Sequence, residues 1–329
     1  MEKLKEVVEG KKVMLCCHWD ADGVSSGGII YHLIRDWVGS VITISKGKRF
    51  VIEKEDIDED CDVVICVDIQ PGDIFDKKVV YIDHHPADFL DKCDYVLHDE
   101  KRQSCSLLIY QDLLKDKSNP YFIFLSLLGY FGDQGKRDEI PKDLYVNAMN
   151  FIPDLMVKRN SYYSEGYYLE IEKYVSALNV GKRMHWKGDV PLELLKCIDC
   201  YKPFIYNTHP LAKQLQDYKK ELRNHYEKDY EVNEVNGFDV VVLQCDNNIQ
   251  GVIAARNMKG KPIIVINQKE GEMIGSMRVP DDMDFDAGKF LDSFNGKIES
   301  YIGGGHEKAG GFTVSLSDFN RWVEMLKEN

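Results

Sequence analysis

The hexapeptide HWDADG near the start of the chain places one imidazole and two carboxylates, His18, Asp20 and Asp22, within five residues. The apolar run 13–17 before it predicts a buried strand, and the apolar spacing over 23–37 predicts a helix after it. These side chains would lie beyond the carboxyl end of a strand, where open α/β sheets bind ligands. The pattern indicates a metal site, although Asp and Gly there also suit an ordinary turn or helix N-cap.

Two further predicted strands repeat this arrangement. Residues 63–67 are a second apolar run, followed by Asp68. Residues 77–82 are a third apolar run, followed by Asp83, His84 and His85. Because the carboxyl ends of parallel strands meet at one edge of a sheet, the polar side chains would converge there. One such strand end could be a turn, but three in succession favour a shared site.

Asp133 stands between glycines after the apolar segment 121–131, which predicts a buried helix. The local sequence favours a helix C-terminal turn at this position over a further inward-pointing ligand. Residues 162–178 and 211–229 also have helical character, and we expect them to connect two domains.

The second half of the chain predicts a small α/β unit of its own. Its expected strands are 238–244, 262–266 and 273–279, with a helix over 249–258, and Arg278 lies near the end of the third strand. The segment GGGHEKAGG follows, and it contains Gly303, Gly304, Gly305, His306 and Lys308. Glycines let backbone N–H groups approach a phosphate closely, and a flexible glycine hairpin is the alternative interpretation.

Composition limits the classes of function. A chain of 329 residues is long enough for two domains, and its net charge of −13 disfavours a protein that grips long nucleic acid through a basic face. No apolar run has the length of a membrane span, and the first residues lack the apolar core of a signal peptide. Nine cysteines, an odd number, do not suggest a disulfide framework. We expect a cytoplasmic protein that does not bind a membrane. A homodimer is one of the oligomeric states that the sequence leaves open.

The ordered motifs resemble those of the DHH phosphoesterase superfamily, in its DHH–DHHA1 branch. His18, Asp20 and Asp22 match the first motif, Asp68 the second, Asp83-His84-His85 the third, Asp133 the fourth, and 303–311 the DHHA1 signature, with Arg278 where that domain presents an arginine. The resemblance implies an α/β fold with a Rossmann-like parallel sheet in the DHH domain and a smaller α/β DHHA1 domain. We assign these domains to 1–185 and 231–329, with a helical linker over 186–230, and expect the active site in the cleft between them.

Members of this family typically depend on manganese and use two adjacent metal ions. The resemblance implies that His18, Asp20 and Asp68 hold one ion, and that Asp22, Asp68, His84 and Asp133 hold the other, with Asp68 bridging. Carboxylates with imidazole suit Mn²⁺, so two divalent ions, Mn²⁺ by preference, are the expected cofactors.

The remaining motif residues would act on the substrate. His85 would contact the phosphate or protonate the leaving oxygen, and Asp83 would orient an imidazole. The expected substrate-binding residues of the second domain are Arg278, Gly303, Gly304, Gly305, His306 and Lys308.

We therefore expect a hydrolase: an Mn-dependent phosphodiesterase of short oligonucleotides or dinucleotides that uses two metals. One alternative is a single-strand-specific RecJ-like exonuclease, although these usually carry a further nucleic-acid-binding domain. Another is a non-catalytic nucleic-acid-binding scaffold, which would have lost metal ligands, whereas every ligand position here holds Asp or His. DHHA1-like domains also occur in alanyl-tRNA synthetases, so that domain alone would not establish hydrolysis.

Overall fold

Five parallel strands form the central sheet of the first unit in this computed structural model, which describes residues 1–47, 50–133, 135–160 and 166–328. The chain divides into two compact units, Met1–Lys182 with Trp186–Lys219, and Arg183–His185 with Lys220–Asn329. None of the described helices is long and apolar enough to cross a membrane.

The sheet of the first unit has the order β2 (Ser40–Lys46), β1 (Lys12–His18), β4 (Val63–Val67), β6 (Lys78–Asp83), β7 (Tyr95–His98), and every pairing in it is parallel. The apolar run of β4 is buried along its whole length, as expected for a strand covered on both faces. The chain leaves β1 for β2 on one side and then crosses to β4 on the other. The strand order therefore reverses beside β1, and open α/β sheets bind ligands at such a point.

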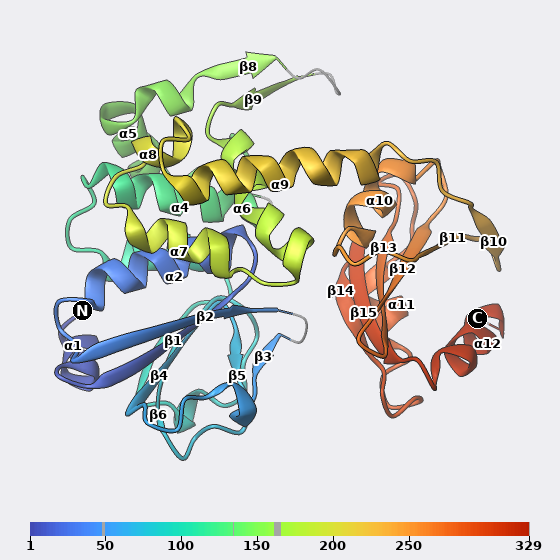
Figure 1. The fold of residues 1–329 in the computed structure, drawn as a ribbon, viewed down its shortest axis with the longest axis horizontal. Helices are drawn as coiled ribbons and strands as arrows, with labels where there is room; N and C mark the ends of the chain where they lie inside the picture. The colour runs from blue at the N-terminus through green and yellow to red at the C-terminus, as the bar shows by residue number, and fades with distance from the viewer. Residues whose placement is uncertain (48–49, 134, 161–165, 329) are drawn as a thin grey trace. The chain divides into compact units, whose positions relative to one another are not determined.

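Helices cover this sheet (Figure 1). The described α-helices between residues 1 and 226 are α1 (Glu2–Val8), α2 (Ala21–Ile34), α3 (Cys105–Leu108), α4 (Pro120–Gly132), α5 (Lys142–Phe151), α6 (Glu172–His185), α7 (Asp189–Cys197), α8 (Lys202–Ile205) and α9 (Pro210–Tyr226). Helix α2 contacts β1, α4 and α7, so it is buried over most of its length. The helix that opens with the first motif is thus held rigidly from several sides.

Residues 186–230 form α7, α8 and α9, and their apolar side chains extend the core of the first unit. Leu192, Leu195, Phe204 and Leu215 all belong to that core. Two pairs of short strands complete the unit: β3 (Val51–Ile52) with β5 (Gln70–Pro71), and β8 (Lys158–Asn160) with β9 (Tyr167–Leu169).

The predicted helix over 162–178 is wrong at its start. Tyr167–Leu169 is strand β9, paired antiparallel with β8, and the helix begins only at Glu172. Two tyrosines in succession suit an extended strand better than a helix, and the side chain of Glu172 accepts a hydrogen bond from the Leu169 N–H, which stops the helix from extending backwards. Residues 161–165 of that prediction lie outside the described residues.

The second unit holds a six-stranded sheet in the order β10 (Asn233–Val235), β11 (Phe238–Leu243), β12 (Ile263–Lys269), β13 (Glu272–Arg278), β15 (Ala309–Ser315), β14 (Ile302–His306). The β11–β12 pairing in this sheet is parallel, and the other described pairings are antiparallel. Its helices are α10 (Gln250–Asn257), α11 (Ala287–Asp292) and α12 (Phe319–Glu328). The predicted fold class is confirmed in both sheets; the cleft between the domains stays a prediction.

Candidate metal centre

The first motif lies at the junction of β1 and α2. The Asp20 side chain caps α2 by accepting a hydrogen bond from the Gly23 N–H at 3.0 Å. A Cβ on Gly23 would overlap the His18 carbonyl, so the tight turn requires glycine. His18 Nδ1 lies 2.9 Å from Asp20 Oδ2 and 3.7 Å from Asp68 Oδ2. The turn therefore points both motif side chains at the end of the neighbouring strand.

Asp68 follows β4 and is almost completely buried. Its backbone has φ 55°, a left-handed conformation that is uncommon outside glycine but that Asp tolerates better than most residues. Its Oδ2 faces His18, and its Oδ1 lies 3.6 Å from His84 Nε2. One carboxylate thus lies between the two predicted ligand groups, as a bridging ligand would.

His84 faces the carboxylates through one defined ring nitrogen. Its Nδ1 lies 3.1 Å from the Arg102 carbonyl, which can only accept, so Nδ1 carries the proton. Nε2 faces Asp133 Oδ2 at 3.1 Å and Asp22 Oδ2 at 3.8 Å, and with a cation bound among these oxygens it would present its lone pair to that cation. Such a carbonyl contact is the usual way in which proteins fix the tautomer of a metal-binding imidazole.

Asp83 is fully buried and holds His85 rather than facing the ligand groups. Its Oδ1 accepts from His85 Nδ1 at 2.8 Å and from two backbone N–H groups, and Tyr81 OH donates to Oδ2 at 2.9 Å. Burial alone would raise the pKa of Asp83, but its bonds with His85 hold that pKa below the ordinary value. Since Nδ1 of His85 is occupied, its Nε2 is the nitrogen left to act on a substrate.

Asp22 enters the centre from the first turn of α2. Its two oxygens accept the backbone N–H groups of Cys105 at 2.6 Å and Ser106 at 3.0 Å. A Cβ on Gly129 of α4 would overlap both Asp22 Oδ1 and Ser106 Oγ, so this glycine leaves the room that the carboxylate occupies. The sequence offered no signal for these supports, because they come from elements far along the chain.

Three groups of side chains have potential ligand atoms within 4.8 Å of one another. They are His18 with Asp20 and Asp68; Asp22 with His84 and Asp133; and Asp68 with Asp83, His84 and His85. The structure thus brings together all the residues of the four N-terminal motifs. Asp133 both ends α4 and faces His84, so its turn and ligand interpretations are compatible.

One direct observation indicates that these residues could bind divalent cations. Asp68 Oδ1 and His84 Nε2 are buried and make no hydrogen bond with any described residue, although buried polar atoms are nearly always paired. Burial, then the neighbouring charge of Asp68, raises the pKa of Asp22, and burial also raises the pKa of Asp68. A cation among these oxygens would give the unpaired atoms a partner and offset the repulsion. The oxygen and nitrogen donors suit Mn²⁺ or Mg²⁺.

Three aromatic side chains near the centre were not predicted. The partly exposed Phe50 makes edge-to-face contacts with the His18 ring at 5.0 Å and the His85 ring at 4.6 Å. Trp19, inside the first motif, contacts Trp186. Nothing in the spacing of these residues indicated that they would meet.

The expected substrate-binding residues lie together in the second unit. Glycines 303–305 and His306 form β14, which pairs with β15, so the segment is a regular hairpin at a sheet edge. The Gly303 N–H already donates to Asn295 Oδ1 at 2.9 Å. Arg278 donates to Ser276 Oγ, Lys308 donates to the Met283 carbonyl, and His306 is exposed. Their roles toward a substrate stay predictions.

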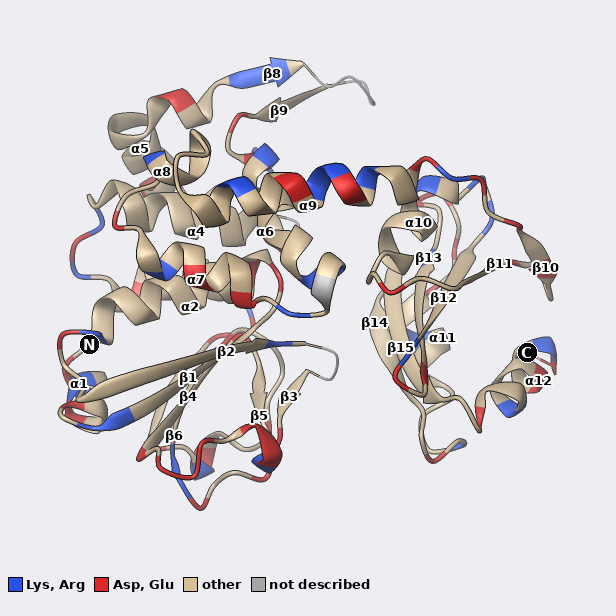
Figure 2. Ribbon diagram, in the orientation of Figure 1, with Lys and Arg blue, Asp and Glu red and all other residues tan. Residues whose placement is uncertain are grey.

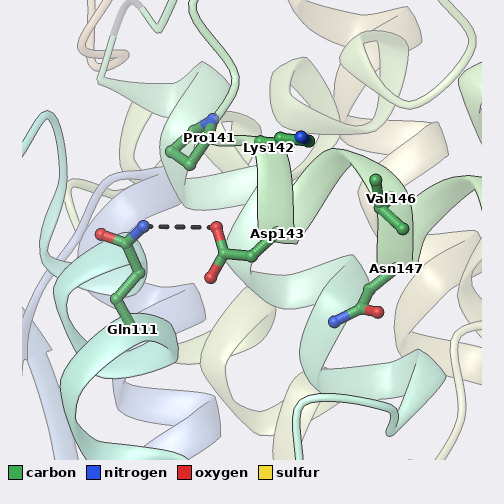
Figure 3. A pocket seen from close by; sticks show the side chains of 6 residues that line it. All are labelled: Gln111, Pro141, Lys142, Asp143, Val146 and Asn147. Carbon is green, nitrogen blue, oxygen red and sulfur yellow. Dashed lines mark hydrogen bonds between the residues drawn. The ribbon is translucent and has the colours of Figure 1, made fainter.

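A separate hollow lies around the start of α5 (Figure 3). Gln111, Pro141, Lys142, Asp143, Val146 and Asn147 line it. Gln111 donates to Asp143 at 3.4 Å there. These lining residues include none of the motif residues and contribute one carboxylate, so we do not regard this hollow as the candidate site.

Comparisons with known proteins agree with the geometry. A family model of the DHHA1 domain matches residues 238–329, and no curated protein sequence matches the chain. The exonuclease RecJ bound to manganese is 17% identical with a TM-score of 0.62, and the alignment covers 99% of this chain and 92% of that one. RecJ with Mn²⁺ from Thermus thermophilus is 18% identical with a TM-score of 0.66, over 99% of this chain and 53% of that one. This chain thus spans about half of the Thermus protein.

A third solved structure, the DHH domain of a member of a family of ribosomal proteins, is 15% identical with a TM-score of 0.64, over 99% of this chain and 87% of that one. At these identities the three likenesses show a shared fold. The family model shows a DHHA1 domain over residues 238–329, and the ordered motifs that converge on one centre agree with the resemblance to the DHH–DHHA1 phosphoesterases.

Proposed function

We propose that this protein is a metal-dependent phosphodiesterase that hydrolyses short oligonucleotides or dinucleotides. The observation that carries the proposal is the pair Asp68 Oδ1 and His84 Nε2, which are buried among carboxylates and make no hydrogen bond with any described residue. A cluster of this kind is destabilised without a cation, and its presence at the reversal point of the sheet is typical of a site that binds a ligand.

The distances support the ligand groups that the family resemblance implies. His18, Asp20 and Asp68 would hold one ion, and Asp22, Asp68, His84 and Asp133 the other, with Mn²⁺ the preferred metal. Two such ions, when bound, neutralise an anionic phosphodiester and make a water nucleophilic at neutral pH. The two RecJ structures similar to this chain contain manganese, which supports the choice of metal.

His85 would then act on the substrate itself. Asp83 fixes its Nδ1–H, so Nε2 can contact the phosphate or give a proton to the leaving oxygen. Arg278, Gly303, Gly304, Gly305, His306 and Lys308 would bind the rest of the substrate from the DHHA1 domain. The planar guanidinium of Arg278 suits a phosphate in particular.

The charge of the chain favours a short substrate. The net charge is −13, and Figure 2 shows that basic and acidic residues alternate along α9. A protein that tracks a long strand usually presents a continuous basic surface, because phosphate contacts dominate its affinity. The RecJ neighbours keep a RecJ-like exonuclease as the second candidate. The complete ligand set disfavours a non-catalytic scaffold.

A substrate panel with Mn²⁺ tests the proposal. It would contain di- to decanucleotides and a 20-mer of RNA and DNA, cyclic dinucleotides, 3′-phosphoadenosine phosphate and pyrophosphate. We expect turnover of the shortest oligonucleotides, with rates that fall as length increases at physiological salt. Rates on the 20-mer equal to those on a trimer would move the protein to the long-strand exonucleases. Binding without turnover of any substrate would favour the scaffold.

A further inference from the structure

The carboxyl end of α6 brings a lysine and a tryptophan beside the first motif. Lys182 Nζ lies 3.7 Å from Asp20 Oδ2, and the Trp186 ring lies 6.2 Å from the ring of Trp19. All four residues belong to the first unit. A cation and an aromatic ring are thus added to the edge of the centre by a segment without any recognised motif.

Trp186 has a left-handed backbone, with φ 56° and ψ 33°, at the C-cap of α6. Its N–H donates to the Lys182 carbonyl at 3.1 Å, which is an ordinary way to end a helix. Glycine or asparagine adopts this conformation at low cost, whereas it is strained for a bulky residue. Strain of this kind concentrates at functional sites, so the indole itself is the feature to explain.

The turn after Trp186 is packed tightly against the first motif. A Cβ on Gly188 would overlap Ser45 Oγ and would lie 2.9 Å from the Trp19 Cα. Trp19 is 7% exposed, so its ring is a buried surface against which Trp186 packs, while Trp186 itself is partly exposed. The indole of Trp186 is therefore packed beside the first motif and remains partly accessible.

We propose that Lys182 and Trp186 form a nucleotide-binding edge of the metal centre, an inference that rests on the proposed function. The Lys182 ammonium would contact a substrate phosphate, and the Trp186 indole would stack on the adjoining nucleobase. Aromatic stacking accepts any base, because every base has a π-face. The edge would make nucleotides preferred over pyrophosphate or simple phosphate esters.

Equilibrium binding of AMP and of ribose 5-phosphate, measured by calorimetry with Mn²⁺ present, tests this edge without any turnover. Trp186→Asn should weaken the binding of AMP by about tenfold and leave the binding of ribose 5-phosphate unchanged, because only AMP has a base that can stack on the indole. Its melting temperature should equal or exceed that of the wild type, since asparagine relieves the left-handed strain. Trp186→Phe, which keeps a ring, should retain part of the difference between the two ligands.

Lys182→Met should weaken the binding of both ligands. Lys187→Met, at an exposed position nearby, is its matched control. The inference would be overturned if the wild type did not bind AMP, or if the wild type and Trp186→Asn bound AMP with equal affinity. It would also be overturned if Lys182→Met and Lys187→Met had the same effect on binding. A protein that binds AMP through Trp186 but hydrolyses nothing in the panel would refute the proposed function alone. If the protein hydrolysed a substrate of the panel but the substitution of Trp186 did not change AMP affinity, only this inference would be refuted.

Discussion

Asp68 Oδ1 and His84 Nε2 lie 3.6 Å apart in the interior of the first unit, and neither atom makes a hydrogen bond with any described residue. They come from two strand ends, those of β4 and β6; the Asp68 backbone N–H donates to the Ile82 carbonyl, and His84 Nδ1 donates to the Arg102 carbonyl. The arrangement is built in advance, and a cation bound between these atoms would complete it.

Divalent metal should stabilise the protein against unfolding. Asp22 and Asp68 repel each other in the buried cluster, and a cation that binds only the folded state removes this cost. At a free Mn²⁺ concentration a hundred times the dissociation constant, the gain should be about 2.7 kcal/mol per site. Thermal melts with EDTA and with increasing Mn²⁺ measure it, and a melting temperature that does not change would contradict the assignment.

Gly129→Ala should damage the ligand group of Asp22, His84 and Asp133. The added methyl group must displace the Asp22 carboxylate or Ser106, and overpacking of this kind costs about 1–3 kcal/mol. Gly28→Ala is the control, because the nearest contacts of its Cβ would be leucine side chains, the first at 3.2 Å. Manganese content and urea unfolding report both effects. Equal manganese in the two variants would show that Asp22 does not need this space.

Asp83→Asn should lower kcat with little change in KM or manganese content. The amide carries no charge to hold the Nδ1–H of His85, so His85 loses its orientation, and the loss should approach the roughly 10²-fold contribution of a general acid. Tyr81→Phe removes one bond to Asp83 but keeps the carboxylate and should retain most activity. If Asp83→Asn lost manganese instead, Asp83 would be a ligand.

His32 should make the metal-free protein less stable in mild acid. Burial lowers the pKa of His32 below its ordinary value, and its Nε2–H donates to the Leu195 carbonyl at 2.8 Å. The unfolded chain therefore binds a proton as the pH falls through about 6.5, before the folded chain does, and stability is lost over that interval down to the folded pKa. In urea unfolding with EDTA, His32→Gln should lose less stability than the wild type between about pH 7.5 and 5.5. Equal losses would exclude this role.

The convergence of most of the polar motif residues was predictable because strand ends carry them. The side chains that follow β1, β4 and β6 are brought to one sheet edge by topology alone, and the polar residues after each apolar run stand out in the sequence. The residue pattern alone could not distinguish the tasks of His84 and His85, which only the family resemblance assigned. That distinction depends on the Arg102 carbonyl, which binds one ring, and on Asp83, which binds the other.

Local sequence patterns gave incomplete or wrong predictions where contacts between distant residues determine the structure. Asp133 does end α4, as the local sequence predicts, but its contact with His84, which is distant in sequence, could not be predicted locally. Tyr167–Leu169 looked helical because its pairing with β8 is invisible locally. Lys182, Trp186 and Phe50 carry no motif, and their position beside the centre follows only from the path of the folded chain.

Manganese content of Asp68→Asn tests the central claim, that one carboxylate serves two ions. Asparagine keeps the volume and tolerates the left-handed backbone of this position, so the fold should survive, but it lacks the charge to bridge two cations. Asp73→Ala, at an exposed carboxylate, is the control. After equilibration with Mn²⁺ and gel filtration, we expect two ions per chain in the wild type and control, and a loss at both positions with no turnover in Asp68→Asn. Two ions still bound to a folded Asp68→Asn would contradict the account.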